Sequence, residues 1–244
     1  MSAFIAVYLR EMLILRRRLK RQISAVAVSP ILYMLTFGYA LGGRLDMGAH
    51  SYIEFLLPGL VAMGSMTQAF GMASEINIAR FYSHIFEEIQ ASPTSRAAYV
   101  MGEVCAGMTR VLLGSVVILV IGRFFGVWLH YGVYFWLAVL LNGFAFAALA
   151  VALAMVVKSH ADQSLLNNFI ITPMAFLGGT FFPMDKLPQW AQTLLSLLPL
   201  THASQAIRAD AFGQAPNPYS FFALAAAGAV FLVLALHTVG KARD

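Results

Sequence analysis

Long apolar stretches alternate with short polar intervals along the whole chain. Residues 22–43 and 55–74 carry no charged residue, and four later stretches are also apolar over 18 residues or more. A helix of that length is long enough to cross a bilayer. We therefore predict an all-α membrane protein, with one transmembrane domain over 1–244. Its six transmembrane helices are expected at about 23–43, 55–74, 103–122, 132–157, 164–182 and 217–237.

The interval after the second apolar stretch has a different pattern. From Ile78 to Ile89 apolar residues recur with the spacing of one helix face, while the opposite face is polar. This predicts a short amphipathic helix over about 80–91. Ser92 is expected to cap the next helix, with Pro93 at its first position. The pattern alone leaves two interpretations open: a docking site for a separate protein, or a solvated loop on the membrane surface.

Two further segments are amphipathic. Residues 3–21 predict a basic helix lying at the membrane interface, ahead of the first span. The connection over 187–212 predicts two short helices outside the bilayer. Pro199 is expected to end the first of them, Thr201 to cap the second, and Gly213 to follow its end.

The distribution of Lys and Arg predicts the orientation. With the N-terminus inside, the inner segments hold eleven of these residues: Arg10, Arg16, Arg17, Arg18, Lys20, Arg21, Arg80, Arg96, Lys158, Lys241 and Arg243. The outer segments hold four, namely Arg44, Arg123, Lys186 and Arg208. Because basic residues concentrate in cytoplasmic segments, both termini are predicted to be cytoplasmic. The helix over 80–91 then faces the cytoplasm.

Composition supports a membrane protein. Hydrophobic residues make up 60% of the chain and charged residues only 11%, with a mean hydropathy of +0.75. The basic run Arg16–Arg18 adjoins a long apolar stretch, which favours a cytoplasmic membrane flank over nucleic-acid binding. The single cysteine, Cys105, excludes a disulfide within the chain.

The sequence contains no recognisable catalytic or metal-binding motif. It has no G-x-x-x-x-G-K-[ST] phosphate loop, no G-x-S-x-G elbow, and histidines without metal-ligand spacing. We therefore expect no catalysis, metal or cofactor on this chain.

Arg110 is the one charge within a predicted span. Such a charge is costly in lipid, so it needs an explanation. We weigh three: an ion pair with Glu75 or Glu103, a role in gating, or contact with a substrate. Uncharged polar residues in the fifth span, among them Asn168 and Thr172, could likewise join helices or bind a ligand.

Three groups of residues resemble a known family: Leu57-Pro58-Gly59; Glu87-Glu88-Ile89 followed by Ser92-Pro93 and Gly102; and Gly178-Gly179, Phe182-Pro183, Leu187-Pro188, Leu198-Pro199-Leu200-Thr201 and Arg208. Together the chain resembles the type-2 membrane subunits of ATP-binding-cassette exporters. It is similar to drug-resistance permeases of the daunorubicin type and to nodulation-factor exporters.

The resemblance implies a permease of the bacterial cytoplasmic membrane that works as a homodimer. A separate ATPase dimer would bind ATP and Mg, and the cargo would be amphipathic or hydrophobic: a drug-like compound, a lipid or a lipid-linked saccharide. No nucleic acid is expected. A scaffold or sensor that binds a cytoplasmic partner, and a membrane-embedded lipid enzyme, are the alternatives.

The resemblance also assigns residues by position. The coupling helix would use Arg80, His84, Glu87, Glu88, Ser92 and Pro93. The first, second and fifth spans would line the substrate path through Tyr33, Phe37, Met63, Met66, Phe70, Asn168, Thr172 and Phe176. Glu75, Glu103 and Arg110 would gate it or form a structural pair. An outer lid would include Gly178, Gly179, Pro183, Pro188 and Arg208.

Overall fold

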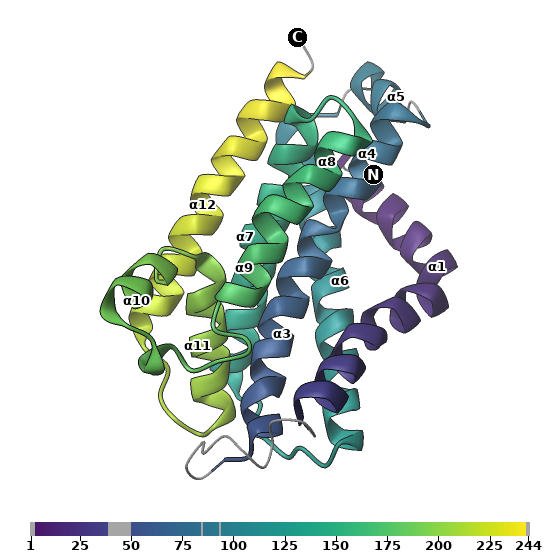
Figure 1. The fold of residues 1–244 in the computed structure, drawn as a ribbon. Helices are drawn as coiled ribbons and strands as arrows, with labels where there is room; N and C mark the ends of the chain where they lie inside the picture. Colours follow the sequence, from purple (N-terminus) through teal and green to yellow (C-terminus); the bar gives the residue numbers. More distant parts are fainter. Residues whose placement is uncertain (1–2, 39–49, 84, 93, 243–244) are drawn as a thin grey trace.

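The computed structural model describes residues 3–38, 50–83, 85–92 and 94–242, and every regular element in these ranges is a helix (Figure 1). The His84 and Pro93 assignments therefore lie outside the described residues. The C-terminus and α5 (Ile85–Ala91) lie at the same end of the bundle, and the N-terminus lies in the same half.

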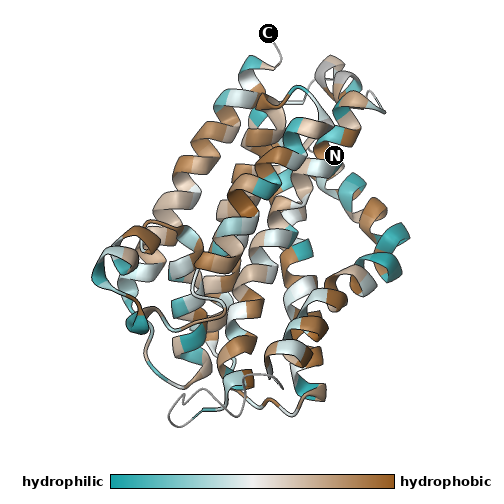
Figure 2. Ribbon diagram, in the orientation of Figure 1, coloured by the Kyte–Doolittle hydropathy of each residue, from teal (hydrophilic) through white to brown (hydrophobic). Residues whose placement is uncertain are grey.

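The first helix is longer than the sequence predicts. α1 (Ala3–Tyr33) is one helix that continues into the π-helical turn η1 (Met34–Gly38) and changes direction partway along (Figure 1). Hydrophilic residues gather where it turns (Figure 2). Val7, Glu11 and Leu15 are buried, one helical turn apart, and the half that carries them packs on α6. The expected interfacial helix and first span are thus one helix, held against the bundle.

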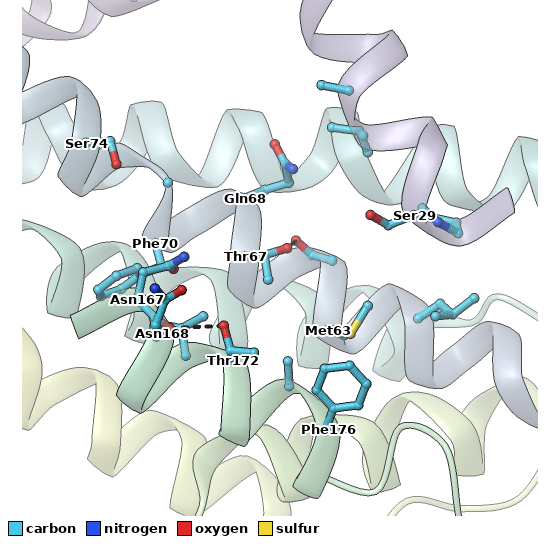
Figure 3. A pocket seen from close by; sticks show the side chains of 18 of the residues that line it. Ser29, Met63, Thr67, Gln68, Phe70, Ser74, Asn167, Asn168, Thr172 and Phe176 are labelled. Atoms are coloured by element: carbon cyan, nitrogen blue, oxygen red, sulfur yellow. Dashed lines mark hydrogen bonds between the residues drawn. The ribbon is translucent and has the colours of Figure 1, made fainter. Parts of the chain in front are cut away.

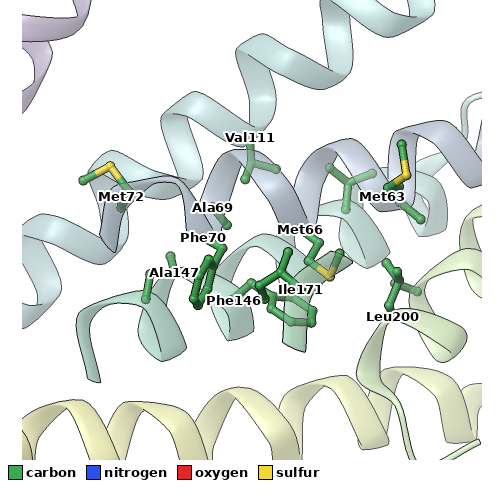
Figure 4. Close-up of a cluster of buried hydrophobic side chains, with 14 of the residues drawn as sticks. Met63, Met66, Ala69, Phe70, Met72, Val111, Phe146, Ala147, Ile171 and Leu200 are labelled. Carbon is green, nitrogen blue, oxygen red and sulfur yellow. The ribbon is translucent and has the colours of Figure 1, made fainter. Parts of the chain in front are cut away.

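The second span forms the centre of the bundle. α3 (Tyr52–Phe70) continues almost directly into α4 (Met72–Phe81), and most of α3 is buried. Ser51 and Glu54 close a capping box at its start. Its methionines and Phe70 pack against Val111, Phe146 and Ile171 from three other elements (Figure 4).

After α5, the third span is α6 (Arg96–Phe124). The prediction that Ser92 caps it is wrong: Ser95 is the N-cap, and its hydroxyl accepts a hydrogen bond from the Ala98 amide. The hydroxyl of Ser92 instead donates to the carbonyl of Ile89 at 2.7 Å, at the end of α5. Both serines suit a cap, so sequence alone did not separate them.

α7 (Val133–Val156) and α12 (Pro218–Lys241) pack along each other. Gly228 permits their approach, because a Cβ there would lie 2.7 Å from the Phe144 ring. α7 is also joined to α3, where the Asn142 amide donates to the Ser65 hydroxyl at 2.7 Å and to the Ala62 carbonyl at 3.1 Å. In apolar surroundings such polar contacts help to fix helix pairing.

The fifth predicted span is not one regular helix. It consists of α8 (His160–Leu166), the π-helical turn η2 (Asn167–Ile171) and α9 (Thr172–Leu177). Pro173, which lacks a backbone N–H, lies in the first turn of α9, just after this irregular turn, where a proline is expected to kink a helix.

The connection to the last helix contains η3 (Met184–Lys186), α10 (Gln189–Leu195) and α11 (Pro199–Ala211). The prediction that Thr201 caps the second helix is wrong, because α11 begins at Pro199 with Leu198 as N-cap. The Thr201 hydroxyl instead donates to the Leu195 carbonyl at 2.7 Å. α11 packs on α3 and α7, and the chain turns at Gly213 with φ of +69°.

Four stretches of the described chain are long and apolar enough to cross a membrane: Tyr52–Phe81, Arg96–Phe124, Val133–Val156 and Pro218–Lys241. Hydrophobic residues run along α12 (Figure 2). The first and fifth predicted spans are not among the four. α1 carries a basic run and ends in a π-turn, and the fifth span is divided into short pieces. The six-span count remains a prediction.

The fold generates a topology test. Ser83, beside α5, and Ser196, after α10, are both exposed. α5 lies at one end of the bundle, and α10 lies well away from that end (Figure 1). With Cys105 replaced by Ser, we expect Ser83→Cys to react with a membrane-impermeant maleimide only after cells are opened. Ser196→Cys should react in intact cells. Labelling of both from the same side would contradict the orientation.

Candidate functional site

A cavity of about 580 Å³ lies between α1, α3 and the α8–η2–α9 segment (Figure 3). The turn η2 supplies Asn167 and Asn168, α3 supplies Thr67 and Gln68, and α1 supplies Ser29. Asparagine, serine and threonine side chains thus share the wall with aromatic and sulfur-containing ones. A volume of this size is typical of small-molecule sites.

Most residues of the predicted substrate path line this cavity: Tyr33, Met63, Phe70, Asn168, Thr172 and Phe176. Phe37 lies beside it, with its ring 6.1 Å from the Tyr33 ring and 5.3 Å from the Phe181 ring. Met66 does not line the cavity. It is fully buried in the core near Phe146 and Ile171 (Figure 4).

Sequence reasoning missed several polar residues of the cavity, among them Ser29, Gln68, Ser74 and Gln163. They come from the same three spans as the predicted path. Their signal was a set of uncharged polar residues within otherwise apolar stretches, which is also the signal of interhelical contacts. The Gln163 amide oxygen does form such a contact, accepting from Asn77 at 2.9 Å.

A buried charge network joins α1, α4 and α6. Arg110 lies 3.2 Å from a carboxylate oxygen of Glu11 and 3.6 Å from one of Glu75. Glu103, fully buried, lies 2.8 Å from Arg10, whose guanidinium also contacts Glu11 at 2.8 Å. The network therefore pairs acidic and basic groups in alternation, which is what burial of charge requires.

The sequence leaves three roles open for Arg110: an ion pair with Glu75 or Glu103, gating, or contact with a substrate. The structure places it 3.6 Å from Glu75, whereas Glu103 pairs with Arg10. Glu11 and Arg10 were missed because residues 3–21 were placed at the membrane interface. Arg18 of α1 adds an outer contact, 3.6 Å from Glu75. The first helix is therefore tied to the helix that leads into α5.

α5 uses its apolar face within the protein. Phe86 is buried, and its ring meets that of Tyr99 on α6 edge to face, with centroids 5.5 Å apart. Arg80 points inward: its guanidinium donates to the Ala154 carbonyl and lies over the Phe86 ring. Glu88 and Ser92 are exposed. Of the assigned coupling residues whose side chains the structure describes, these two face outward; the side chain of Glu87 lies outside the described part.

A second set of contacts lies near the opposite end of the bundle. Arg208 of α11 donates to the Gly179 carbonyl at 2.9 Å and to the Phe55 carbonyl at 3.3 Å, and it lies over the Phe55 ring. Gly179 has φ of +75°, a conformation that favours glycine. The Gly178 carbonyl accepts a hydrogen bond from Ser204 at 2.6 Å. Three of the assigned lid residues therefore form one cluster.

The two assigned prolines lie nearby in sequence but have other contacts. Pro183 precedes η3 and lines a smaller cavity of about 270 Å³ together with Arg208. Pro188 is the N-cap of α10. Its position is structural, at the start of a helix, and the structure does not bring it to the Arg208 cluster.

Comparisons with known proteins agree on one family. A family model described as ABC-2 type transporter matches residues 2–212. The chain is 30% identical over 184 residues to the inner membrane transport permease YadH of Escherichia coli K12, covering 74% of this chain and 72% of that protein. It is 28% identical over 222 residues to nodulation protein J of Rhizobium leguminosarum bv. viciae, covering 86% and 83%.

The charge network generates a stability prediction. Replacing Glu11 with Leu leaves Arg110 without its nearer partner, and breaking a buried pair costs about 3–5 kcal/mol. We expect a clearly lower thermal unfolding temperature in detergent for Glu11→Leu. The double variant Glu11→Leu/Arg110→Leu should recover part of the loss, and Glu88→Leu, at an exposed site, should change little. An unchanged unfolding temperature for Glu11→Leu would contradict this role of the network.

Proposed function

Because the chain belongs to the ABC-2 type transporter family, we propose that it is the membrane subunit of an ATP-driven exporter for amphipathic or hydrophobic cargo. The family match over residues 2–212 carries this proposal, together with helices of membrane-spanning length. The matched relatives include an inner membrane transport permease. The chain is accordingly a multi-pass membrane protein with the role of a transporter subunit.

We propose that α5 receives the motion of a separate ATPase subunit. This helix packs on α6 through Phe86 and Tyr99, so a push on its outer face would be transmitted into the bundle. Its exposed acidic residue, Glu88, is available to a partner. ATP and Mg would bind to that partner, since the chain lacks a phosphate loop.

α5 is connected to the cavity wall through consecutive helices of the chain. α4 precedes α5, and α3, which precedes α4, lines the cavity. Glu75 of α4 also contacts Arg110, which reaches α1 through Glu11. A displacement of α5 would therefore reach two walls of the cavity, α3 and α1. This is a mechanical basis for coupling hydrolysis to access.

We propose that two copies of the chain enclose the cargo path. The cavity lies along the exposed sides of η2 and α9, where Asn167 and Asn168 are exposed in the single chain. Polar side chains facing lipid at this depth are costly. A second copy packed over this face would shield them and complete the walls.

Charge reversal on α5 tests the docking. Glu88→Lys should reduce co-purification of the ATPase subunit and abolish ATP-driven transport. The substitution replaces the anionic side chain in the proposed contact with a longer, cationic one. Asp185→Lys, which also reverses an acidic charge at an exposed position but lies in η3, outside α5, is the matched control. The variant must still insert, as shown by its amount in the membrane. Undiminished co-purification for Glu88→Lys would count against docking through this face of α5.

A further inference from the structure

The cavity wall is polar but carries no charge. Among the described residues that line it, none is Asp, Glu, Lys, Arg or His. Its polar groups are amides and hydroxyls: Ser29, Thr67, Gln68, Ser74, Gln163, Ser164, Asn167, Asn168 and Thr172, with the phenol of Tyr33. An ionised headgroup entering this space would lose water without gaining a counter-ion, which is strongly unfavourable. The wall therefore favours neutral ligands.

Two amides in particular are available to a ligand. Other polar groups of the wall already have partners. The side-chain oxygen of Gln68 accepts a hydrogen bond from Gln22, and the Thr172 hydroxyl donates to the Asn167 carbonyl. By contrast, the side-chain amides of Asn167 and Asn168 form no hydrogen bond with any other group in the described ranges. A polar group within the membrane must find a partner. These amides can each offer donors and an acceptor to a ligand.

The backbone that carries the two asparagines departs from regular α-helix. Asn167 and Asn168 begin the π-helical turn η2, where the Thr172 amide bonds to the Asn167 carbonyl five residues back. On the opposite wall, the π-helical turn η1 follows Tyr33 directly. Such wide turns are frequent at functional sites. Here one such turn supplies wall residues, and the other begins directly after the wall residue Tyr33.

The two side-chain amides and the aromatic cluster lie at different ends of the cavity. In Figure 3, Ser74, Asn167 and Asn168 lie toward one end, where the Phe70 ring also lies, and Met63 and Phe176 lie toward the other, where Ser29 adds one hydroxyl. The Phe176 ring stacks on Phe181 with centroids 5.2 Å apart, and Tyr33 meets Phe181 edge to face at 5.0 Å. An amphiphile would thus place its polar head near the asparagines and its apolar part among the aromatic rings.

We propose that this cavity selects cargo with an uncharged, hydroxyl- or amide-rich headgroup, such as a saccharide on an apolar tail, with Asn167 and Asn168 as the selecting residues. The inference rests on the proposed function, and it narrows the cargo to neutral glycolipid-like compounds. Cationic amphiphiles and anionic lipids are disfavoured, because no described wall residue would neutralise them.

Binding to the purified chain in nanodiscs tests this without the ATPase. Three tritiated probes share a dodecyl tail: dodecyl maltoside, dodecyltrimethylammonium and dodecyl phosphate, each used below its critical micelle concentration and corrected for empty nanodiscs. We expect saturable binding of the maltoside, at least tenfold tighter than either charged probe. Equal affinity for all three, or no saturable binding of the maltoside to folded protein, would overturn the proposal.

Single substitutions assign the selectivity to residues. Asn168→Leu removes up to two hydrogen bonds and should weaken maltoside binding about tenfold. Asn168→Asp, nearly the same in shape, should shift preference toward dodecyltrimethylammonium by a similar factor. Phe169→Leu, at the adjacent position outside the cavity wall, should leave the ranking unchanged. If Asn168→Asp binds the three probes with the same order of affinities as the unaltered protein, the headgroup does not bind at Asn168.

The same probes separate this inference from the proposed function. If the maltoside binds selectively but is not moved by ATP in proteoliposomes containing the ATPase, the transport proposal fails and the selectivity stands. If all three amphiphiles are transported equally well, transport stands and the selectivity fails.

Discussion

The structure depends on how charge is neutralised inside an apolar bundle. Arg110 and Glu103 are both almost fully buried on α6, and each is paired with a residue from the first helix. Unpaired, either would be strongly destabilising. The pairing therefore fixes the first half of α1 against α6, aided by Gly102, where a Cβ would lie 2.7 Å from Val7. Glu75 extends this anchor to α4.

This arrangement places the two ends of the proposed mechanism on one connected set of helices. α4 connects α5 to the charge network and continues α3, which forms a cavity wall. On the far side, Arg208 joins the start of α3 to Gly179, beyond the end of α9. The helices around the cavity are thus held by the charge network at one end and by the Arg208 hydrogen bonds at the other. Movement of these helices would break or exchange those contacts.

The sequence predicted the elements well where periodicity and length were decisive. The fourth and sixth apolar stretches, at about 132–157 and 217–237, correspond to α7 and α12 almost end to end. An amphipathic helix was expected over 80–91, and α5 occupies Ile85–Ala91 of that range. The caps were predicted poorly, because Ser92 and Ser95 offer the same chemistry three residues apart and only the tertiary path of the chain separates them.

The site was less accessible to sequence reasoning. Pairing of Glu11 with Arg110 spans 99 positions, and no local pattern reveals a contact of that range. Six of the eight predicted path residues line the cavity, but Met66 shows that an apolar side chain in the right helix can face the core instead. Helix period predicts which residues share a face, and not which face meets a cavity.

ATP-dependent movement of cargo by the reconstituted permease and its ATPase tests the central claim most directly. In proteoliposomes holding both proteins, the account predicts uptake of a dodecyl glycoside that requires hydrolysable ATP on the α5 side and stops when a non-hydrolysable analogue replaces it. Uptake that proceeds equally without ATP, or none at all despite an assembled and ATP-hydrolysing complex, would contradict it.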